Sequence, residues 1–313
     1  MEEIYRQVVK PAVDAKYEIR DGCGYLVPHQ DGMAFNKTEA AAIIEKNRNN
    51  DRPYIIPLNV LKPKVYSSNP ESQLFKDTLS CAASKMTNHN ENRLNNLRLA
   101  ASKINGVILN PNETFSYNTY IGEVSYENGF REATIYSDGK LGRGIGGGVC
   151  QISSVLYSAA LQANLKIIKR SNHSFTVDYL PLGHDATFAG SEKDLRFKNS
   201  TKNPIKILAS VDDNGAYVTI LGTNPDKDIG ISIENIIRKT IPFKTIQSVD
   251  SSLPDNTIMI VQKGKNGYEV DTYRILSKNG NTIKREFIYK SKYASLDQIE
   301  KVNCKPRTTN YEP

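Results

Sequence analysis

The stretch that decides the fold reads Gly142-Arg143-Gly144-Ile145-Gly146-Gly147-Gly148-Val149-Cys150-Gln151-Ile152-Ser153-Ser154. Adjacent glycines lose much conformational entropy on folding and bury nothing, so a fold keeps them where the backbone turns sharply or where something, such as a ligand, approaches it closely. A helix is predicted over residues 152–163, because apolar side chains recur there at helical spacing. They are Ile152, Val155, Leu156, Ala159, Ala160 and Ala163.

Cys150 stands at or next to the first residue of that helix. Unpaired backbone N–H groups and the positive end of the helix dipole favour an anion at this position, and a thiolate is an anion. We therefore expect a thiol pKa below the free value of about 8.5 and a nucleophile available near neutral pH. The same N–H groups suit the oxyanion that forms when sulfur attacks a carbonyl.

Two other interpretations of the glycine-rich stretch stay open. One is a tight turn with a buried structural cysteine behind it. The other is a phosphate-binding loop, which the absence of Gly-Lys-Ser/Thr after the glycines argues against.

A cysteine nucleophile needs a base, and His173 is the best placed of the four histidines. Residues 174–179 alternate polar and apolar side chains as a strand does, which turns His173 toward the core. His184 is the second choice. Asp185 is the candidate for orienting the imidazole, a role that a backbone carbonyl could fill equally well. Zinc bound by these residues and Cys150 is a further alternative, but their spacing matches no zinc signature. No metal and no cofactor are therefore predicted.

The chain as a whole divides into three parts, and the predicted fold class is multi-domain α+β. Residues 1–66 are predicted to form a small α+β module, residues 70–227 a mixed α/β catalytic domain, and residues 228–313 an all-β module. In the first part, Asn36 and Glu39 form a capping box at the start of a helix.

Regular patterns recur in the two later parts. Residues 90–104 have a helical apolar face that ends at Asn105-Gly106. Asn214-Gly215 and Asn279-Gly280 each lie between alternating apolar stretches, which predicts two β-hairpins.

The charge and its distribution along the sequence limit the kinds of partner that the protein is expected to bind. The net charge of +7 suits an anionic partner, but Lys and Arg are scattered and no nucleic-acid motif is present, so nucleic acid is not expected. The sequence contains no apolar run of membrane-spanning length and no secretory segment, and it is compatible with a membrane anchor preceding it. The cysteines other than Cys150 are interpreted as small inert side chains at positions 23, 81 and 304.

Four sequence runs are distinctive. They are Asn112-Glu113-Thr114-Phe115-Ser116-Tyr117-Asn118, residues 146–157 around Cys150, His173-Ser174-Phe175-Thr176-Val177-Asp178-Tyr179 and Gly183-His184-Asp185-Ala186-Thr187. These runs resemble the VanW domain of Gram-positive cell-wall proteins, in the right order over roughly residues 85–212. Residues 9–65 resemble the peptidoglycan-binding module that commonly precedes VanW, and residues 240–303 resemble a G5 domain.

The resemblance implies an L,D-transpeptidase that joins peptidoglycan stem peptides in 3-3 cross-links through a thioester on Cys150, with His173 as the base. It implies an extracytoplasmic location and binding to wall polymer, and a monomer is expected. Predicted contacts with the stem peptide are Gly147, Gly148, Gln151, Arg143 and Tyr136. The alternatives are a cysteine endopeptidase or carboxypeptidase acting on stem peptides, and a non-catalytic adhesion or scaffold protein.

Overall fold

The computed structural model describes residues 2–20, 23–49, 53–66, 74–137, 140–190 and 192–303. Strands make up 42% of the chain and helices 18%, so the structure is mostly β and the predicted α+β class is confirmed only in part. Among the described residues, no helix is long and apolar enough to cross a membrane.

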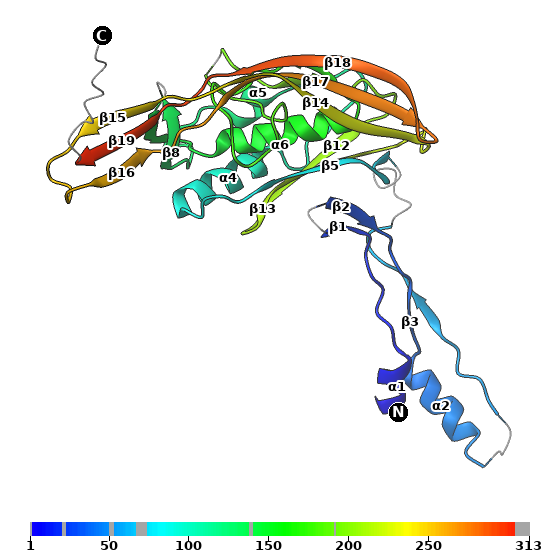
Figure 1. Ribbon diagram of the computed structural model, residues 1–313. Coiled ribbons are helices and arrows are strands. Elements are labelled where there is room, and N and C mark those ends of the chain that lie inside the picture. The colour runs from blue at the N-terminus through cyan, green and yellow to red at the C-terminus, as the bar shows by residue number, and fades with distance from the viewer. Residues whose placement is uncertain are drawn as a thin grey trace, which may run out of the picture.

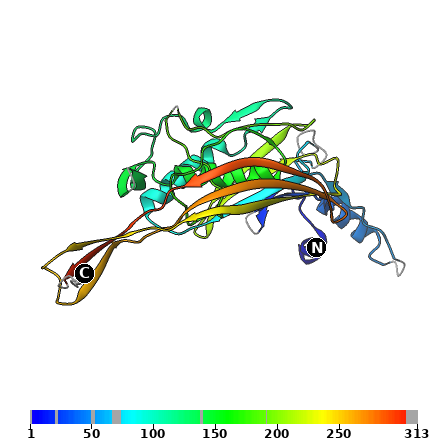
Figure 2. The same cartoon turned by 45° about the horizontal axis from the view of Figure 1, so that its top comes forward.

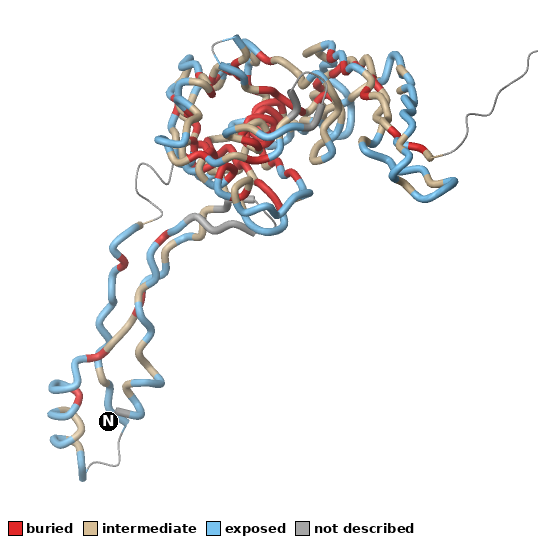
Figure 3. The backbone as a smooth tube through the Cα atoms, turned by 90° about the vertical axis from the view of Figure 1, so that its left-hand side faces the viewer, coloured by how far each residue is buried: buried red, intermediate tan, exposed pale blue. Residues whose placement is uncertain are grey.

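The N-terminal arm, residues 2–66, extends away from the rest of the molecule and is mostly exposed (Figures 1 and 3). The Asn36 half of the predicted capping box is confirmed, because the Asn36 side chain accepts hydrogen bonds from the backbone N–H groups of Thr38 and Glu39. The elements of the arm are α1 (Glu2–Val8), β1 (Lys16–Arg20), β2 (Cys23–Val27), β3 (Gly32–Ala34), α2 (Lys37–Lys46) and β4 (Asn59–Leu61).

The middle region, residues 74–222, is built on an antiparallel sheet in the order β5-β13-β12-β6. Both predicted helices and the hairpin at Asn214-Gly215 are confirmed, although the second helix, α6, begins at Val149 instead of residue 152. The elements are β5 (Asp77–Lys85), α4 (Glu91–Ile104), β6 (Ile108–Leu109), β7 (Thr114–Ser116), α5 (Tyr117–Ile121), β8 (Glu132–Ser137), β9 (Lys140–Ile145), α6 (Val149–Gln162), β10 (Lys166–Lys169), β11 (Arg196–Lys198), β12 (Ile205–Val211) and β13 (Gly215–Gly222).

The C-terminal region, residues 229–303, contains two separate sheets of three strands. The proximal sheet, β14-β17-β18, contains the predicted Asn279-Gly280 hairpin, in which both turn residues have positive φ as such a turn requires. The distal sheet, β15-β19-β16, projects away from the helices (Figure 2). The strands are β14 (Ile229–Ile241), β15 (Thr245–Val249), β16 (Thr257–Gln262), β17 (Gly267–Lys278), β18 (Asn281–Tyr293) and β19 (Gln298–Asn303).

Helix α6 is the centre of the core. It contacts β5 and β13 of the middle sheet and β14 of the proximal sheet, and in Figure 1 it lies between these two layers. Every residue from Gln151 to Leu161 is buried, as is expected for a helix covered on all sides. The proximal sheet also caps the end of α6, because Arg274 donates hydrogen bonds to the carbonyls of Leu161 and Leu165. This burial fixes the position of Cys150 at the other end of the helix.

Two predictions are wrong. Residues 174–179 form no strand: they belong to an irregular loop whose backbone is held by contacts such as the one from Ala294 N–H to the Ser174 carbonyl. Cys81 is not an inert thiol but is disulfide-bonded. Cys304 and the side chain of Cys23 lie outside the described part of the structure.

Candidate active site

Cys150 is the second residue of α6, and the glycines before it bring the chain there. Gly148 is the N-cap and has a left-handed φ of 113°, which a side chain would disfavour. Gly147 lies so close to β8 that a Cβ would sit 2.7 Å from the Thr134 carbonyl oxygen. Packing therefore explains these two glycines without a ligand.

The Cys150 sulfur lies beside the backbone of residues 187 and 188. The Phe188 N–H donates to Sγ at 3.4 Å, and the Phe188 carbonyl lies 3.4 Å from the same atom. The Thr187 hydroxyl is 3.7 Å away. Cys150 is partly buried and is a free thiol. A sulfur that receives an N–H group in this way is suited to carry a negative charge.

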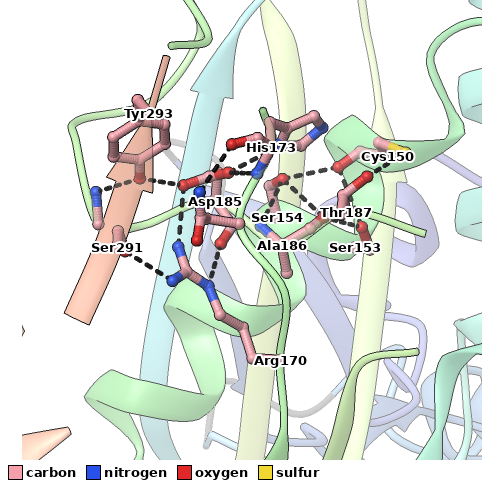
Figure 4. A network of polar contacts seen from close by, with 12 residues as sticks. Cys150, Ser153, Ser154, Arg170, His173, Asp185, Ala186, Thr187, Ser291 and Tyr293 are labelled. Atoms are coloured by element: carbon pink, nitrogen blue, oxygen red, sulfur yellow. Dashed lines mark hydrogen bonds and ion pairs between the residues drawn. The ribbon is translucent and has the colours of Figure 1, made fainter. Parts of the chain in front are cut away.

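His173 lies between Asp185 and Cys150 in the close view of the site (Figure 4). Its ring Nδ1 is 2.7 Å from Asp185 Oδ2, and its backbone N–H donates to the same oxygen, also at 2.7 Å. Asp185 therefore fixes both the ring and the main chain of His173. Because Nδ1 is engaged with the carboxylate, Nε2 is the nitrogen left for proton transfer.

Protonation of the pair follows from these contacts. Burial opposes ionisation of Cys150, but the hydrogen bond and charge of His173 outweigh it and lower the pKa of the thiol. Burial likewise disfavours the imidazolium, yet Asp185 and Cys150 together raise the pKa of His173 to about 9. Both shifts favour a thiolate–imidazolium pair near neutral pH.

Asp185 is itself held from two sides. Its Oδ1 accepts hydrogen bonds from Arg170 Nη2 at 2.9 Å and from the Tyr293 hydroxyl at 2.5 Å. Burial would raise the pKa of this carboxyl, but hydrogen bonding to His173 and the Arg170 charge lower it to about 2. Arg170 is completely buried between the rings of Tyr157 and Tyr289. The Asp185 carboxylate is therefore ionised and fixed in position.

Two serines of α6 connect the nucleophile to this loop. The Ser154 hydroxyl donates to the Cys150 carbonyl at 2.7 Å and accepts the Ala186 N–H at 3.0 Å. The Ser153 hydroxyl donates to the Ala186 carbonyl. Since Ala186 follows Asp185 directly, the Ser-Ser pair of the motif sets the distance between the helix start and the acid.

The other predicted stem-peptide contacts have structural partners. Gln151 is buried, with its amide nitrogen bonded to Ser84 and Lys85 and its oxygen to Arg93. Arg143 lies on the exposed hairpin strand β9 and pairs with Glu132 at 3.5 Å. The side chain of Tyr136 lies outside the described residues. Stem-peptide binding by Gly147, Gly148, Gln151, Arg143 and Tyr136 stays a prediction.

His184, the second candidate base, faces Ser158 of α6, where its Nδ1 lies 2.9 Å from the hydroxyl oxygen. Burial, followed by the Arg170 charge, lowers the pKa of His184, so it is neutral at pH 7. No cluster of three or more potential metal ligands occurs in the part of the chain that the structure describes.

Arg93 is a site residue that the sequence did not reveal. It belongs to α4, yet its stem passes over Gly148, where an added Cβ would lie 3.2 Å from Arg93 Cγ. Burial lowers the pKa of the guanidinium, while the negative charge of the Cys150 thiolate opposes this shift. Its Nε is buried without a hydrogen-bond partner. A lone arginine on a helix face gives no signal of such a position.

Two cavities lie in the middle region and share no lining residue. One, of about 410 Å³, is lined by Lys85, Tyr179 and Asn214 among others. The other, of about 440 Å³, is lined by Glu123 and by Phe188, whose backbone contacts Sγ. Neither cavity is lined by Cys150 or His173 itself.

Two known protein families match separate stretches of this sequence. The family described as VanW like protein matches residues 92–221, and the G5 domain family matches residues 233–305. The chain contains a VanW-like domain followed by a G5 domain. Cys150, His173, Asp185 and Arg170 lie within the VanW-like match, whereas Tyr293 lies within the G5 match.

Two curated relatives share the VanW-like part. The uncharacterized protein YoaR of Bacillus subtilis is 37% identical over 135 residues, which are 43% of this chain and 45% of YoaR. The vancomycin B-type resistance protein VanW of Enterococcus faecalis is 33% identical over 132 residues, 40% of this chain and 47% of that protein. The chain therefore matches less than half the length of each relative.

Two solved G5 domains are similar to part of the chain. The IgA1 protease G5 domain is 27% identical and covers 24% of this chain and 88% of its own, with a TM-score of 0.18. The crystal structure of another G5 domain, HP0197-G5, is 18% identical over 24% of this chain and 99% of its own, with a TM-score of 0.15. Scores this low add nothing to the sequence match. The VanW-like and G5 domains together point to a cell-wall-associated protein.

Proposed function

We propose that this protein is a peptidoglycan L,D-transpeptidase with Cys150 as nucleophile. The observation that carries the proposal is the arrangement of a thiolate, an imidazole and a carboxylate in the order that acyl transfer requires. Cys150 lies at a helix N-terminus, His173 lowers its pKa, and Asp185 holds His173 by two hydrogen bonds.

The first half of the reaction forms a thioester. The Cys150 thiolate attacks the carbonyl of the third, diamino acid residue in a donor tetrapeptide stem. The C–N bond to the terminal D-alanine breaks, and the His173 imidazolium gives its proton to the departing amine. Val149 N–H and Gln151 N–H at the start of α6 already donate to the Gly146 and Gly148 carbonyls, so the Cys150 N–H is the group proposed to stabilise the oxyanion of the tetrahedral intermediate.

The second half restores the enzyme. The side-chain amine of the diamino acid in a neighbouring stem attacks the thioester carbonyl, and the C–S bond breaks. His173 takes the proton from this amine, so the thiolate–imidazolium pair forms again. The products are a 3-3 cross-link and one D-alanine, with no oxidant or external energy source needed.

Transfer and hydrolysis differ in what must bind near the nucleophile. A transferase must bind a donor stem and an acceptor stem, and we propose the two cavities as their places, one of them lined by the Phe188 that contacts the sulfur. An endopeptidase or carboxypeptidase needs only the donor place. Because water can still compete for the thioester, product analysis with and without an added acceptor stem distinguishes the two activities.

The same proposal places the protein outside the cytoplasm, in contact with wall polymer. The disulfide at Cys81 supports this location, because such bonds persist in oxidising compartments. The G5 domain is proposed to bind the wall polymer, and the domain limits 1–66, 70–227 and 228–313 are retained as part of this proposal.

Intact-mass analysis with purified muropeptides tests the chemistry. The full chain is expected to gain the mass of an acyl group, and Cys150→Ala is expected to gain none. His173→Gln retains an N–H group that can donate to Asp185, but it should form the adduct far more slowly, since the thiol loses its base. An adduct that persists on Cys150→Ala would overturn the proposal.

Alkylation at about pH 6 tests the non-catalytic alternative, because only a thiol with a lowered pKa reacts quickly there. Slow reaction of Cys150, at the rate of an ordinary thiol, would favour a scaffold or adhesion protein.

A further inference from the structure

A patch of four cations lies on one face of the small sheet β10-β11-β7. Strand β10 pairs antiparallel with β11, and the register places Lys166 opposite Lys198 and Lys169 opposite Arg196. Phe197, between the two β11 cations, is fully buried. Because successive side chains on a strand point to opposite faces, Arg196 and Lys198 point away from the core. We call these four residues the basic patch.

This arrangement costs stability. Like charges directly opposite each other on neighbouring strands repel, and a protein without use for them would be expected to alternate their signs. Lys166, Lys169 and Lys198 have no ion pair among the residues that the structure describes. Arg196 has only Asp194, at 4.0 Å. That carboxylate already accepts hydrogen bonds from Ser116 and Asn118.

The third strand supplies no negative charge either. Strand β7 places Thr114 beside Lys198 and Ser116 beside Arg196, so its contribution to this face is hydroxyl groups. The two cation pairs lie two residues apart along β11, or about 7 Å. Paired positive charges repeated at this spacing fit an extended polyanion better than a single small anion.

We propose that the basic patch binds a phosphodiester polymer of the cell wall. Charge complementarity gives the chemical class, and the net charge of +7 adds long-range attraction. The disulfide at Cys81 and the VanW-like and G5 domains favour a polymer outside the cell over nucleic acid. The patch lies on strands that flank the site loop, with Arg170 next to Lys169, so binding there would keep the site close to the wall. The inference does not depend on catalysis by Cys150.

Binding of inorganic polyphosphate to the full chain, measured over a range of salt concentrations, tests the proposal. The double variant Lys166→Gln/Lys198→Gln is expected to lower the slope of log affinity against log salt by about 2, one for each charge removed. The matched control Lys76→Gln/Lys85→Gln removes the same charge from exposed positions outside both the basic patch and the G5 match, and it should leave the slope unchanged. An equal loss in both variants, or no binding by the parent chain, would overturn the proposal.

Two further measurements distinguish polymer binding by the patch from a structural role and from attachment to a membrane. Thermal unfolding of Lys166→Gln/Lys198→Gln should occur at the same or a higher temperature, because repulsion is relieved. A lower temperature would indicate a structural role and count against binding. Vesicles containing phosphatidylglycerol test a lipid surface as the occupant. Vesicle binding that is lost in this variant, without any binding of polyphosphate, would replace the polymer with a membrane.

Discussion

The two sheets of the C-terminal region share one family match but differ in what they contact. The proximal sheet packs against α6 and the site loop, and its residues Val270, Thr272 and Ser291 are fully buried. The distal sheet exposes its apolar side chains, such as Val249 at 70% and Ile258 at 56%. Matching a domain family therefore does not tell which part of the domain is an independent module.

The proximal sheet is part of the candidate site. Tyr293 donates to the Asp185 carboxylate, and Ser291 accepts a hydrogen bond from Arg170. Lys292 and Ala294 bond to the backbone and side chains of the loop that carries His173. A VanW-like domain cut at the end of its family match would lose all of these contacts, so we expect the site to need the proximal sheet.

Removing the buried Arg170 guanidinium should have the largest effect on the free energy of unfolding. Arg170→Met leaves the Asp185 carboxylate buried with one fewer partner, and breaking a buried ion pair costs about 3–5 kcal/mol of unfolding free energy. Urea denaturation measures it. Lys301→Met is the control in the distal sheet, where the pair with Asp250 has the same 2.9 Å separation but is exposed. The comparison fails if both variants unfold at similar urea concentrations.

The second-largest loss of unfolding free energy is expected at Gly183, where the site loop contacts the proximal sheet. Gly183 has a φ of +82°, and a Cβ there would lie 2.5 Å from both Asn235 Oδ1 and Thr272 Oγ1 of the proximal sheet. Gly106 has nearly the same φ, +83°, and nothing within 4 Å. Gly106→Ala should therefore cost about 1 kcal/mol for the backbone alone. Gly183→Ala should cost about 1–3 kcal/mol more, because the sheet must shift.

Equal losses in the two alanine variants would mean that the loop moves away from the sheet without cost. That result would also weaken the view that the proximal sheet holds the site, since Gly183 N–H donates to the Tyr293 hydroxyl at this point.

The sequence predicted those parts of the site that depend on local pattern. Periodicity gave both helices, the Asn-Gly pairs gave both hairpins, and the glycine string placed Cys150 near a helix start. The loop around His173 was missed, because alternating apolar residues imitate a strand whether or not a neighbouring strand is available to pair with them. Contacts such as Tyr293 with Asp185 join residues 108 positions apart, and no local pattern contains them.

Replacing a valine in each sheet by threonine should give a smaller difference in unfolding free energy. Val270 of β17 is fully buried, whereas Val261 of β16 is 53% exposed. Valine and threonine have nearly the same shape, so the substitution mainly adds a hydroxyl group. Val270→Thr should cost about 1–3 kcal/mol, since that hydroxyl must be buried. Val261→Thr should change the unfolding free energy by no more than about 0.5 kcal/mol. A measurable loss in Val261→Thr would mean that the distal sheet is covered in solution.

The smallest effect concerns two carboxylates whose pKa values are both lowered to about 2. For Asp185, hydrogen bonding to His173 and the Arg170 charge overcome burial. For exposed Asp250, hydrogen bonding to Ser252 comes first and to Lys301 second. Each carboxylate stabilises the fold above the unfolded pKa of about 3.9, and this contribution is lost as the pH falls toward 2.

Added salt distinguishes the Asp185 carboxylate from the Asp250 carboxylate. At 1 M salt the Debye length is about 3 Å, and the ions screen exposed charges far more than buried ones. In an NMR titration of the carboxyl carbons, added salt should raise the pKa of Asp250 part of the way toward its ordinary value and leave that of Asp185 unchanged. The rise at Asp250 is only partial, since its hydrogen bonds to Ser252 are not removed by screening. If salt moved both values equally, water would have to reach Asp185, and the proximal sheet could not be closing the site as its contacts indicate.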